Sequence, residues 1–196
     1  MLYRFAFALA ALAVAVPASA QTPPPPEMVS VAIETSKGRI VLALEKARAP
    51  ATTANFLAYV DQKKFDGESF YRAMPYGEGG LIQGGITSNA AKLLPPVKHE
   101  PTSVTGVRHV AGTIAMARVE PGSARSDFFI LTTDIDQFDA SPSDPGFAVF
   151  GRVVEGMEVI KTILAAPRSP TKGAGTMKGQ MLDPPVRILK ATRVAD

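Results

Sequence analysis

Apolar and polar residues alternate on both sides of a short polar stretch near the start of the chain. The segment VSVAIETSKGRIVLALE covers residues 29–45, and its alternation breaks only at Ser36-Lys37-Gly38. A period of two places every second side chain on one face of a strand, and glycine tolerates the backbone conformation of a tight turn. The pattern therefore predicts a β-hairpin.

Further short apolar runs, bounded by glycine, proline or polar residues, predict more strands. The last of them, VRILKATRV at 186–194, alternates cleanly to the end of the chain. The others occupy residues 70–72, 81–83, 112–118, 127–132 and 147–154.

Two segments have the periodicity of helices. The first begins at Pro50, a residue type favoured in the first helical turn, and ends near Asp66-Gly67. Its apolar residues recur at the spacing of one helix face. The second, MEVIKTILA at 157–165, is short and amphipathic. Residues 166–185 are rich in Gly, Pro and Lys and predict a long loop.

Strands outnumber helices in this pattern and do not alternate regularly with them. A doubly wound parallel sheet would need that alternation. The pattern instead favours a mainly β fold, a closed antiparallel β-barrel with two α-helices packed on its ends. The chain has 196 residues, of which 46% are hydrophobic, and this suffices for one domain with its own core.

The first twenty residues have the composition of a secretory signal peptide. Arg4 precedes an apolar run from Phe5 to Val16, and Ala18-Ser19-Ala20 matches a small-x-small cleavage site. The run is shorter than the ~20 residues of a membrane-spanning helix, which favours cleavage over an anchor. We expect an exported, periplasmic protein without membrane association after cleavage. It would have a signal peptide at 1–20, a Pro-rich linker at 21–27 and one domain at 28–196.

The charge and the missing residue types exclude several kinds of chemistry. The formal net charge is +3, and the basic residues do not cluster as in nucleic-acid-binding proteins, so we expect no nucleic-acid partner. The chain has no cysteine, which excludes disulfides and thiolate chemistry. His99 and His109 have no carboxylates spaced to join them, so we expect no metal site and no cofactor.

The stretch FYRAMPYGEGGLIQGG, residues 70–85, combines an arginine with a glycine-rich run. A phosphate-binding P-loop needs a lysine after its last glycine, and here Ile86 follows Gly85. A dinucleotide-binding motif needs a third glycine where Ile82 stands. Both phosphate-binding interpretations fail, and this stretch alone favours Arg72 as a surface residue of a strand.

Four motifs, in order along the chain, resemble those of the cyclophilin family of peptidyl-prolyl isomerases. The resemblance covers Val29 to Val194 and implies an eight-stranded antiparallel β-barrel capped by two α-helices. Residues 50–56 are similar to the start of the family's first helix. Residues 70–72 with 83–85 resemble F-H-R…Q-G-G, residues 116–117 with 126–130 resemble M-A…S-Q-F-F-I, and residues 147–157 resemble V-F-G-x-V-x-x-G-M.

The resemblance also implies an active site. Arg72 matches the catalytic arginine, and Gln83 matches the glutamine that orients the substrate or the arginine. Phe129 matches the aromatic floor of the proline pocket. The other substrate-binding positions implied are Tyr71, Leu81, Ala117, Arg118, Asp127, Phe138 and Phe147.

The glycine-rich middle of this stretch departs from the family pattern. With Gln83 as the anchor, Gly80 stands where the family has a phenylalanine. The segment between Arg72 and Gln83 is also three residues longer than in the family. We expect Met74 or Tyr76 to fold back and fill the space.

Charged and aromatic replacements also distinguish this chain from the family. Asp127 replaces a glutamine and would place a negative charge near Arg72, which it would partly neutralise. Arg118 replaces an asparagine and would instead pair with Asp127. Tyr71 and Phe147 replace histidines.

The sequence therefore predicts a peptidyl-prolyl isomerase that accelerates rotation about X-Pro bonds in exported proteins and assists their folding. The alternative is a weakly active or inactive module of the same fold that binds proline-containing segments, and Gly80, Asp127 and Phe147 motivate it. We expect a monomer whose partners are proline-containing polypeptides. In a further alternative, Pro23–Pro26 of one molecule occupies the groove of another and produces self-association.

Overall fold

A computed structural model describes residues 27–194 of the chain. The expected signal peptide at 1–20 and residues 21–26 of the expected linker, Pro23–Pro26 included, lie outside the described residues. Within the described part, no helix has both the length and the apolar character needed to cross a membrane.

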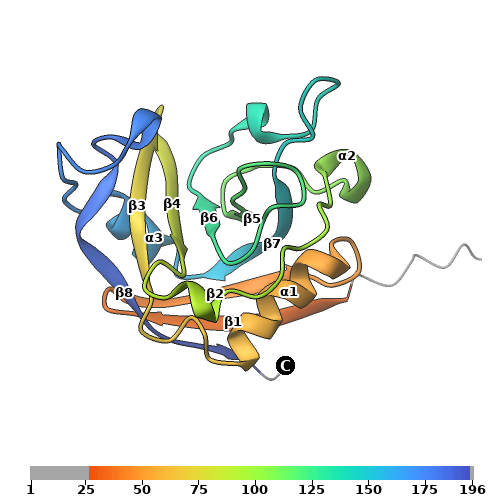
Figure 1. Cartoon of the computed structure of the whole chain (residues 1–196), viewed down its shortest axis with the longest axis horizontal. Coiled ribbons are helices and arrows are strands. Elements are labelled where there is room, and N and C mark those ends of the chain that lie inside the picture. The colour runs from red at the N-terminus through yellow and green to blue at the C-terminus, as the bar shows by residue number, and fades with distance from the viewer. Residues whose placement is uncertain (1–26, 195–196) are drawn as a thin grey trace, which may run out of the picture.

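Eight strands form one closed antiparallel barrel (Figure 1). Around the barrel their order is β1, β2, β7, β5, β6, β4, β3 and β8. The hairpin expected at 29–45 is confirmed, because β1 and β2 pair along their whole length. The predicted mainly β barrel is therefore confirmed. The strands are β1 Met28–Thr35, β2 Gly38–Glu45, β3 Ser69–Tyr76, β4 Gly79–Gly85, β5 Thr113–Met116, β6 Phe128–Leu131, β7 Ala148–Glu155 and β8 Met181–Arg193.

Within the described residues, three α-helices accompany the barrel, one more than the sequence predicts. α1 (Pro50–Asp61) and α3 (Met157–Leu164) lie at opposite ends of the barrel (Figure 1), and Pro50 stands in the first turn of α1. α2 (Thr102–Thr105) is a single turn that ends at Gly106, whose φ is +68°. An element of four residues is too short to show helical periodicity in the sequence.

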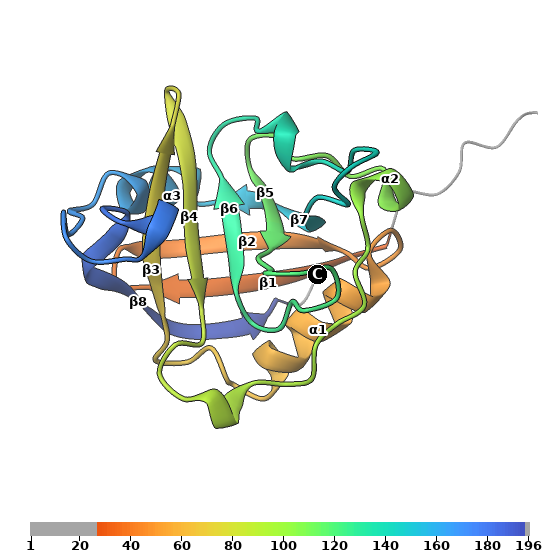
Figure 2. The same cartoon turned by 45° about the horizontal axis from the view of Figure 1, so that its top comes forward.

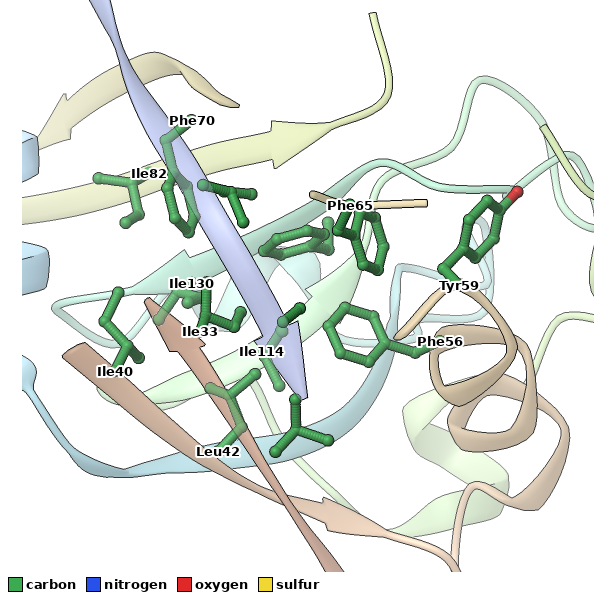
Figure 3. Packing of buried hydrophobic residues seen from close by; sticks show 14 of the residues in the cluster. Ile33, Ile40, Leu42, Phe56, Tyr59, Phe65, Phe70, Ile82, Ile114 and Ile130 are labelled. Atoms are coloured by element: carbon green, nitrogen blue, oxygen red, sulfur yellow. The ribbon is translucent and has the colours of Figure 1, made fainter. Parts of the chain in front are cut away.

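Aromatic and aliphatic side chains fill the interior of the barrel (Figure 3). Phe56 of α1 packs against Phe128 of β6 and Phe150 of β7, with ring centroids 5.3 and 5.2 Å apart. Phe70 of β3 approaches Phe128 at 5.6 Å, and all four rings are fully buried. The helix and the strands thus share one core.

A second, smaller apolar cluster lies on the outer face of the barrel. On β6, Phe128 and Ile130 belong to the interior cluster, whereas Phe129 and Leu131 belong to the second. The alternation of side chains along a strand accounts for this division. Phe129 is nevertheless buried, because side chains from the connection between β6 and β7, such as Phe138, pack over it.

β3 and β4 form a longer hairpin than the short strands expected at 70–72 and 81–83. Their pairing continues to Tyr76 and Gly79, so the glycine-rich middle of the stretch belongs to the hairpin and does not fold back as a loop. Figure 2 shows the tip of this hairpin extending beyond the neighbouring strands.

A β-bulge in β3 decides on which face Arg72 lies. Phe70 pairs with Gly84 and Arg72 with Gln83, so Tyr71 is the additional residue on β3. A regular strand would place Arg72 on the same face as Phe70, inside the barrel. The bulge shifts the alternation by one residue, and Arg72 therefore lies outside, opposite Gln83.

The connection from α3 to β8 is shorter than the loop predicted at 166–185. β8 already begins at Met181, which pairs with Arg72 of β3. Just before it, the backbone oxygen of Gln180 accepts a hydrogen bond of 2.9 Å from the N–H of Ala73. Figures 1 and 2 both show this connection beside the β3–β4 hairpin.

Candidate active site

A cavity of about 540 Å³ opens on the outer face of the barrel beside β3, β4 and β6. Its lining includes every residue that the sequence predicts for the site, although these residues are far apart in the chain. They are Tyr71, Arg72, Leu81, Gln83, Ala117, Arg118, Asp127, Phe129, Phe138 and Phe147.

Three phenylalanine rings form the aromatic part of the cavity. Phe129 comes from β6, and Phe138 and Phe147 from the connection between β6 and β7. Their ring centroids lie 5.7 Å (Phe129–Phe138), 5.3 Å (Phe129–Phe147) and 5.0 Å (Phe138–Phe147) apart, each pair edge to face. Edge-to-face packing is a favourable arrangement of aromatic rings. The three rings therefore pack closely together, and we call them the aromatic corner of the cavity.

Met74 and Leu81 extend the apolar wall from the β3–β4 hairpin. They stand opposite each other in the hairpin, and both line the cavity. Tyr76 is 40% exposed and does not line the cavity, and its hydroxyl accepts a hydrogen bond from Gln137. Of the two residues expected to fill the space near Gly80, only Met74 reaches the cavity. It does so from its place in the strand, not by folding back.

The Arg72 guanidinium is held by neutral partners. Its Nη1 donates to Oε1 of Gln83 at 2.8 Å. Its Nε and Nη2 both donate to Oε1 of Gln180, at 2.8 and 2.7 Å, and Nη2 also donates to Sδ of Met74 at 3.4 Å. Burial lowers the pKa of Arg72, with Tyr71 acting in the opposite direction, yet an arginine in a protein stays protonated. The site therefore holds a half-buried positive charge.

A chain of hydrogen bonds connects Asp127 to Arg72. The Tyr71 hydroxyl donates to Oδ1 of Asp127 at 2.9 Å and accepts from Nε2 of Gln83 at 2.6 Å. These bonds orient the amide of Gln83 with its oxygen toward Arg72. Burial raises the pKa of Tyr71, and Asp127 adds to that effect. Burial also raises the pKa of Asp127, against the hydrogen bond from Tyr71.

The expected pairing of Asp127 with Arg118 is wrong. Nη2 of Arg118 donates to Asp144 at 2.6 Å, its Nε donates to the backbone oxygen of Gly146 at 2.8 Å, and its guanidinium lies 5.1 Å from the Phe147 ring centroid. The loop before β7 supplies these partners, and the sequence around Arg118 contains no sign of them.

Asp127 also forms no direct contact with Arg72 that would neutralise its charge as expected. Among residues 27–194, no carboxylate forms a salt bridge with Arg72. Asp127 reaches Arg72 only through Tyr71 and Gln83. The charge of Arg72 is therefore not compensated by an adjacent anion.

Several residues of the cavity have no counterpart in the sequence motifs. Met177, Gln180 and Met181 surround Arg72 or line the cavity from the connection before β8 and the start of that strand. This connection lacks periodicity and matches no motif, so only the barrel topology, which places β8 beside β3, could have indicated it.

His109 lies behind the aromatic corner. Its ring is fully buried, stacks on Phe129 with centroids 6.0 Å apart, and approaches the edges of Phe138 and Phe147. Nδ1 is 2.7 Å from Oδ1 of Asp139 and must donate to it, so Nε2 carries the lone pair. Nε2 has no hydrogen-bond partner among the described residues. Burial lowers the pKa of His109 against the opposing effect of Asp139.

The burial of His109 predicts a loss of stability in mild acid. The unfolded chain binds a proton on this histidine near pH 6.5, the ordinary pKa, whereas the folded protein binds it only at lower pH. The unfolded state therefore binds more protons in this window. The free energy of unfolding should fall as the pH falls below about 6.5, by up to about 1.4 kcal/mol per pH unit.

Urea unfolding between about pH 5 and pH 8 would measure this dependence. The His109→Asn variant is the control, because asparagine keeps an N–H donor for Asp139 but does not titrate. Its stability should depend less on pH than that of the wild type. If the free energy of unfolding changed with pH equally in the two proteins, another group would cause the effect.

Comparisons with known proteins agree with this architecture. A family model described as cyclophilin type peptidyl-prolyl cis-trans isomerase/CLD matches residues 30–193. Peptidyl-prolyl cis-trans isomerase A of Dickeya dadantii is 43% identical over 137 residues, which cover 68% of this chain and 70% of that protein. Peptidyl-prolyl cis-trans isomerase cyp18 of Streptomyces antibioticus is 39% identical over 153 residues, which cover 74% of this chain and 89% of that protein.

A solved structure supports the same fold. The crystal structure of a cyclophilin type peptidyl-prolyl cis-trans isomerase of Cryptosporidium parvum superimposes with a TM-score of 0.69 at 19% identity. The match covers 87% of this chain and 99% of that one. Together with the matched family model, this confirms the resemblance seen in the sequence motifs. The chain belongs to the cyclophilin-type peptidyl-prolyl cis-trans isomerases.

Proposed function

We propose that this isomerase binds the proline ring of exported polypeptides in the aromatic corner and that Arg72 stabilises the twisted X-Pro bond. The observation that carries the proposal is a charged guanidinium, without an ion-pair partner among the described residues, at the edge of an apolar cavity. Phe129, Phe138 and Phe147 line this cavity and give the proline ring an apolar surface to contact.

The reaction explains why such a site suffices. The barrier to rotation of a peptide bond is about 18–20 kcal/mol and arises from resonance, so no covalent bond has to break. When the bond is twisted, the lone pair of the proline nitrogen is localised and can accept a hydrogen bond. A fixed cationic donor binds this state better than the planar one, which is the condition for catalysis.

Rotation of the substrate also needs a site that does not rearrange. Arg72, Gln83, Tyr71 and Asp127 are joined by hydrogen bonds of 2.6–2.9 Å. Pre-oriented donors do not have to reorganise when the bond twists. An ionised Asp127 can only accept hydrogen bonds, so a substrate would have to donate one to it from an N–H group.

Export rests on the sequence of residues 1–20, which has the charge, apolar run and cleavage site of a signal peptide. If residues 1–20 are a signal peptide, the mature protein begins at Gln21 and lies in the periplasmic fraction. N-terminal sequencing of that fraction tests the idea. An uncleaved chain beginning at Met1 and retained in the cytosol would contradict it.

The isomerase activity itself is tested by NMR exchange spectroscopy on a short X-Pro peptide. Uncatalysed exchange takes roughly tens to hundreds of seconds, so no exchange peaks between cis and trans signals are expected without enzyme. A small molar fraction of the protein should produce them. Peptide shift changes without exchange between the isomers would instead indicate binding alone.

A further inference from the structure

Gln180 contacts the Arg72 guanidinium more extensively than any other described residue does. Its Oε1 accepts two hydrogen bonds, from Nε at 2.8 Å and from Nη2 at 2.7 Å. Gln83, on the neighbouring strand, accepts only one. Two bonds from adjacent nitrogens to one oxygen fix the plane of the guanidinium as well as its position.

The donors of Arg72 can be accounted for one by one. A guanidinium has five N–H groups, one on Nε and two on each Nη. Gln180 accepts from Nε and from Nη2, Met74 accepts the second N–H of Nη2, and Gln83 accepts one of Nη1. Within residues 27–194, one N–H of Nη1 is left without an acceptor. Because Arg72 lines the cavity, that group is the candidate donor to a substrate.

Gln180 is itself held in one orientation. Its Nε2 donates to the backbone oxygen of Thr176 at 2.8 Å, so its amide oxygen must face Arg72. Its backbone N–H donates to the oxygen of Met177 at 3.1 Å, and its backbone oxygen accepts from the N–H of Ala73 at 2.9 Å. The connection before β8 is thereby attached to β3 next to the bulge that carries Arg72.

We infer that Gln180 is a positioning residue for catalysis. By occupying Nε and Nη2, it turns the remaining N–H of Nη1 toward the cavity. The inference rests on the proposed role of Arg72 as the donor to the twisted bond. Since Arg72 has several rotatable bonds, one bond to Gln83 and the longer contact with Met74 would hold its plane less firmly, and misplaced donors lose much of their effect on rate.

The test compares Gln180→Met with the wild type. Methionine has a similar length but no strong acceptor, so the guanidinium loses two hydrogen bonds while the loop keeps its bulk. We expect kcat on an X-Pro peptide to fall about tenfold or more, with KM changing less than about twofold. Gln180→Glu, which restores oxygen acceptors for Nε and Nη2, should recover part of the loss. Lys178→Met, an exposed position of the same connection, should leave kcat unchanged.

A second readout does not depend on activity. The Nε–Hε group of Arg72, assigned by its loss in Arg72→Lys, should give an ordered, slowly exchanging NMR signal in the wild type and a broadened, fast-exchanging one in Gln180→Met. If Arg72→Ala lowers the rate while Gln180→Met changes neither kcat nor this signal, the inference about Gln180 fails alone. If Arg72→Ala has no effect on the rate, the proposed function of Arg72 fails instead.

Discussion

Replacing Arg72 by alanine is expected to lower kcat/KM on an X-Pro peptide by about 10²–10³-fold. This is the usual effect of removing one pre-oriented donor from a site that stabilises developing charge or lone-pair density. The aromatic corner is built from other residues, Phe129, Phe138 and Phe147, so a large part of the substrate affinity should remain. The loss should therefore appear mainly in kcat, measured by NMR exchange spectroscopy at several peptide concentrations.

Two further variants separate the charge of Arg72 from its geometry. Arg72→Lys keeps a positive charge but has no planar group that could bond both Gln83 and Gln180. Its rate should therefore lie much closer to that of Arg72→Ala than to that of the wild type. Arg152→Ala removes an arginine from the exposed part of β7, away from the cavity, and should not change the rate. A rate for Arg72→Ala close to the wild-type rate would contradict the role given to Arg72.

The barrel could be predicted from the sequence because its strands are locally consistent. The alternation at 29–45 and at 186–194 places one face of each strand in the core, and the structure has strands there. The strands predicted from the pattern already number eight, in agreement with the eight-stranded barrel that the family resemblance implies. α2 is not predicted from the sequence, because a single turn of four residues is too short to show helical periodicity.

The face on which Arg72 lies could not be derived from alternation. Phe70 and Arg72 are two residues apart, so a regular strand would bury both in the barrel. The bulge at Tyr71 reverses this arrangement, and it becomes evident only from the pairing of β3 with β4 and β8. The resemblance to a family therefore supplied what local periodicity could not.

The sequence motifs predict only those partners of Arg72 that belong to the motifs themselves. Gln83 lies on the paired strand, and its contact with Arg72 follows from the hairpin. Gln180 comes from a connection without periodicity, and its contact follows from the closure of the barrel between β3 and β8. Contacts between segments so distant in sequence depend on the whole topology.

Phenylalanine at position 80, the residue type that the family resemblance implies there, is expected to destabilise this protein. Gly80 has a φ of +148°, and a Cβ built on it would lie 2.1 Å from the backbone oxygen of Met74 and 2.9 Å from Cα of Pro75. The backbone oxygen of Gly80 also accepts a hydrogen bond of 2.8 Å from Thr132. A side chain at this position must therefore push apart the two strands that carry Met74 and Leu81.

Gly80→Ala and Gly80→Phe should both lower the free energy of unfolding. The unfavourable φ alone should lower the free energy of unfolding by about 1–3 kcal/mol, and the overlap with the Met74 backbone adds to this loss. Urea unfolding measures the loss. Gly77→Asn is the matched control in the same hairpin, because Gly77 has a φ of +56°, which asparagine tolerates, and a Cβ added there would meet no other atom within 4 Å.

The effect on catalysis should follow the effect on the hairpin. Met74 already occupies the cavity wall and accepts a hydrogen bond from Arg72, so moving β3 away from β4 displaces both the wall and the donor. We expect Gly80→Ala to lower kcat/KM and Gly77→Asn to leave it near the wild-type value. A stable Gly80→Phe protein with faster isomerisation would show that position 80 does not require glycine. Met74 supplies the cavity wall next to Gly80, and glycine is required at position 80 because the backbone of Met74 lies against it.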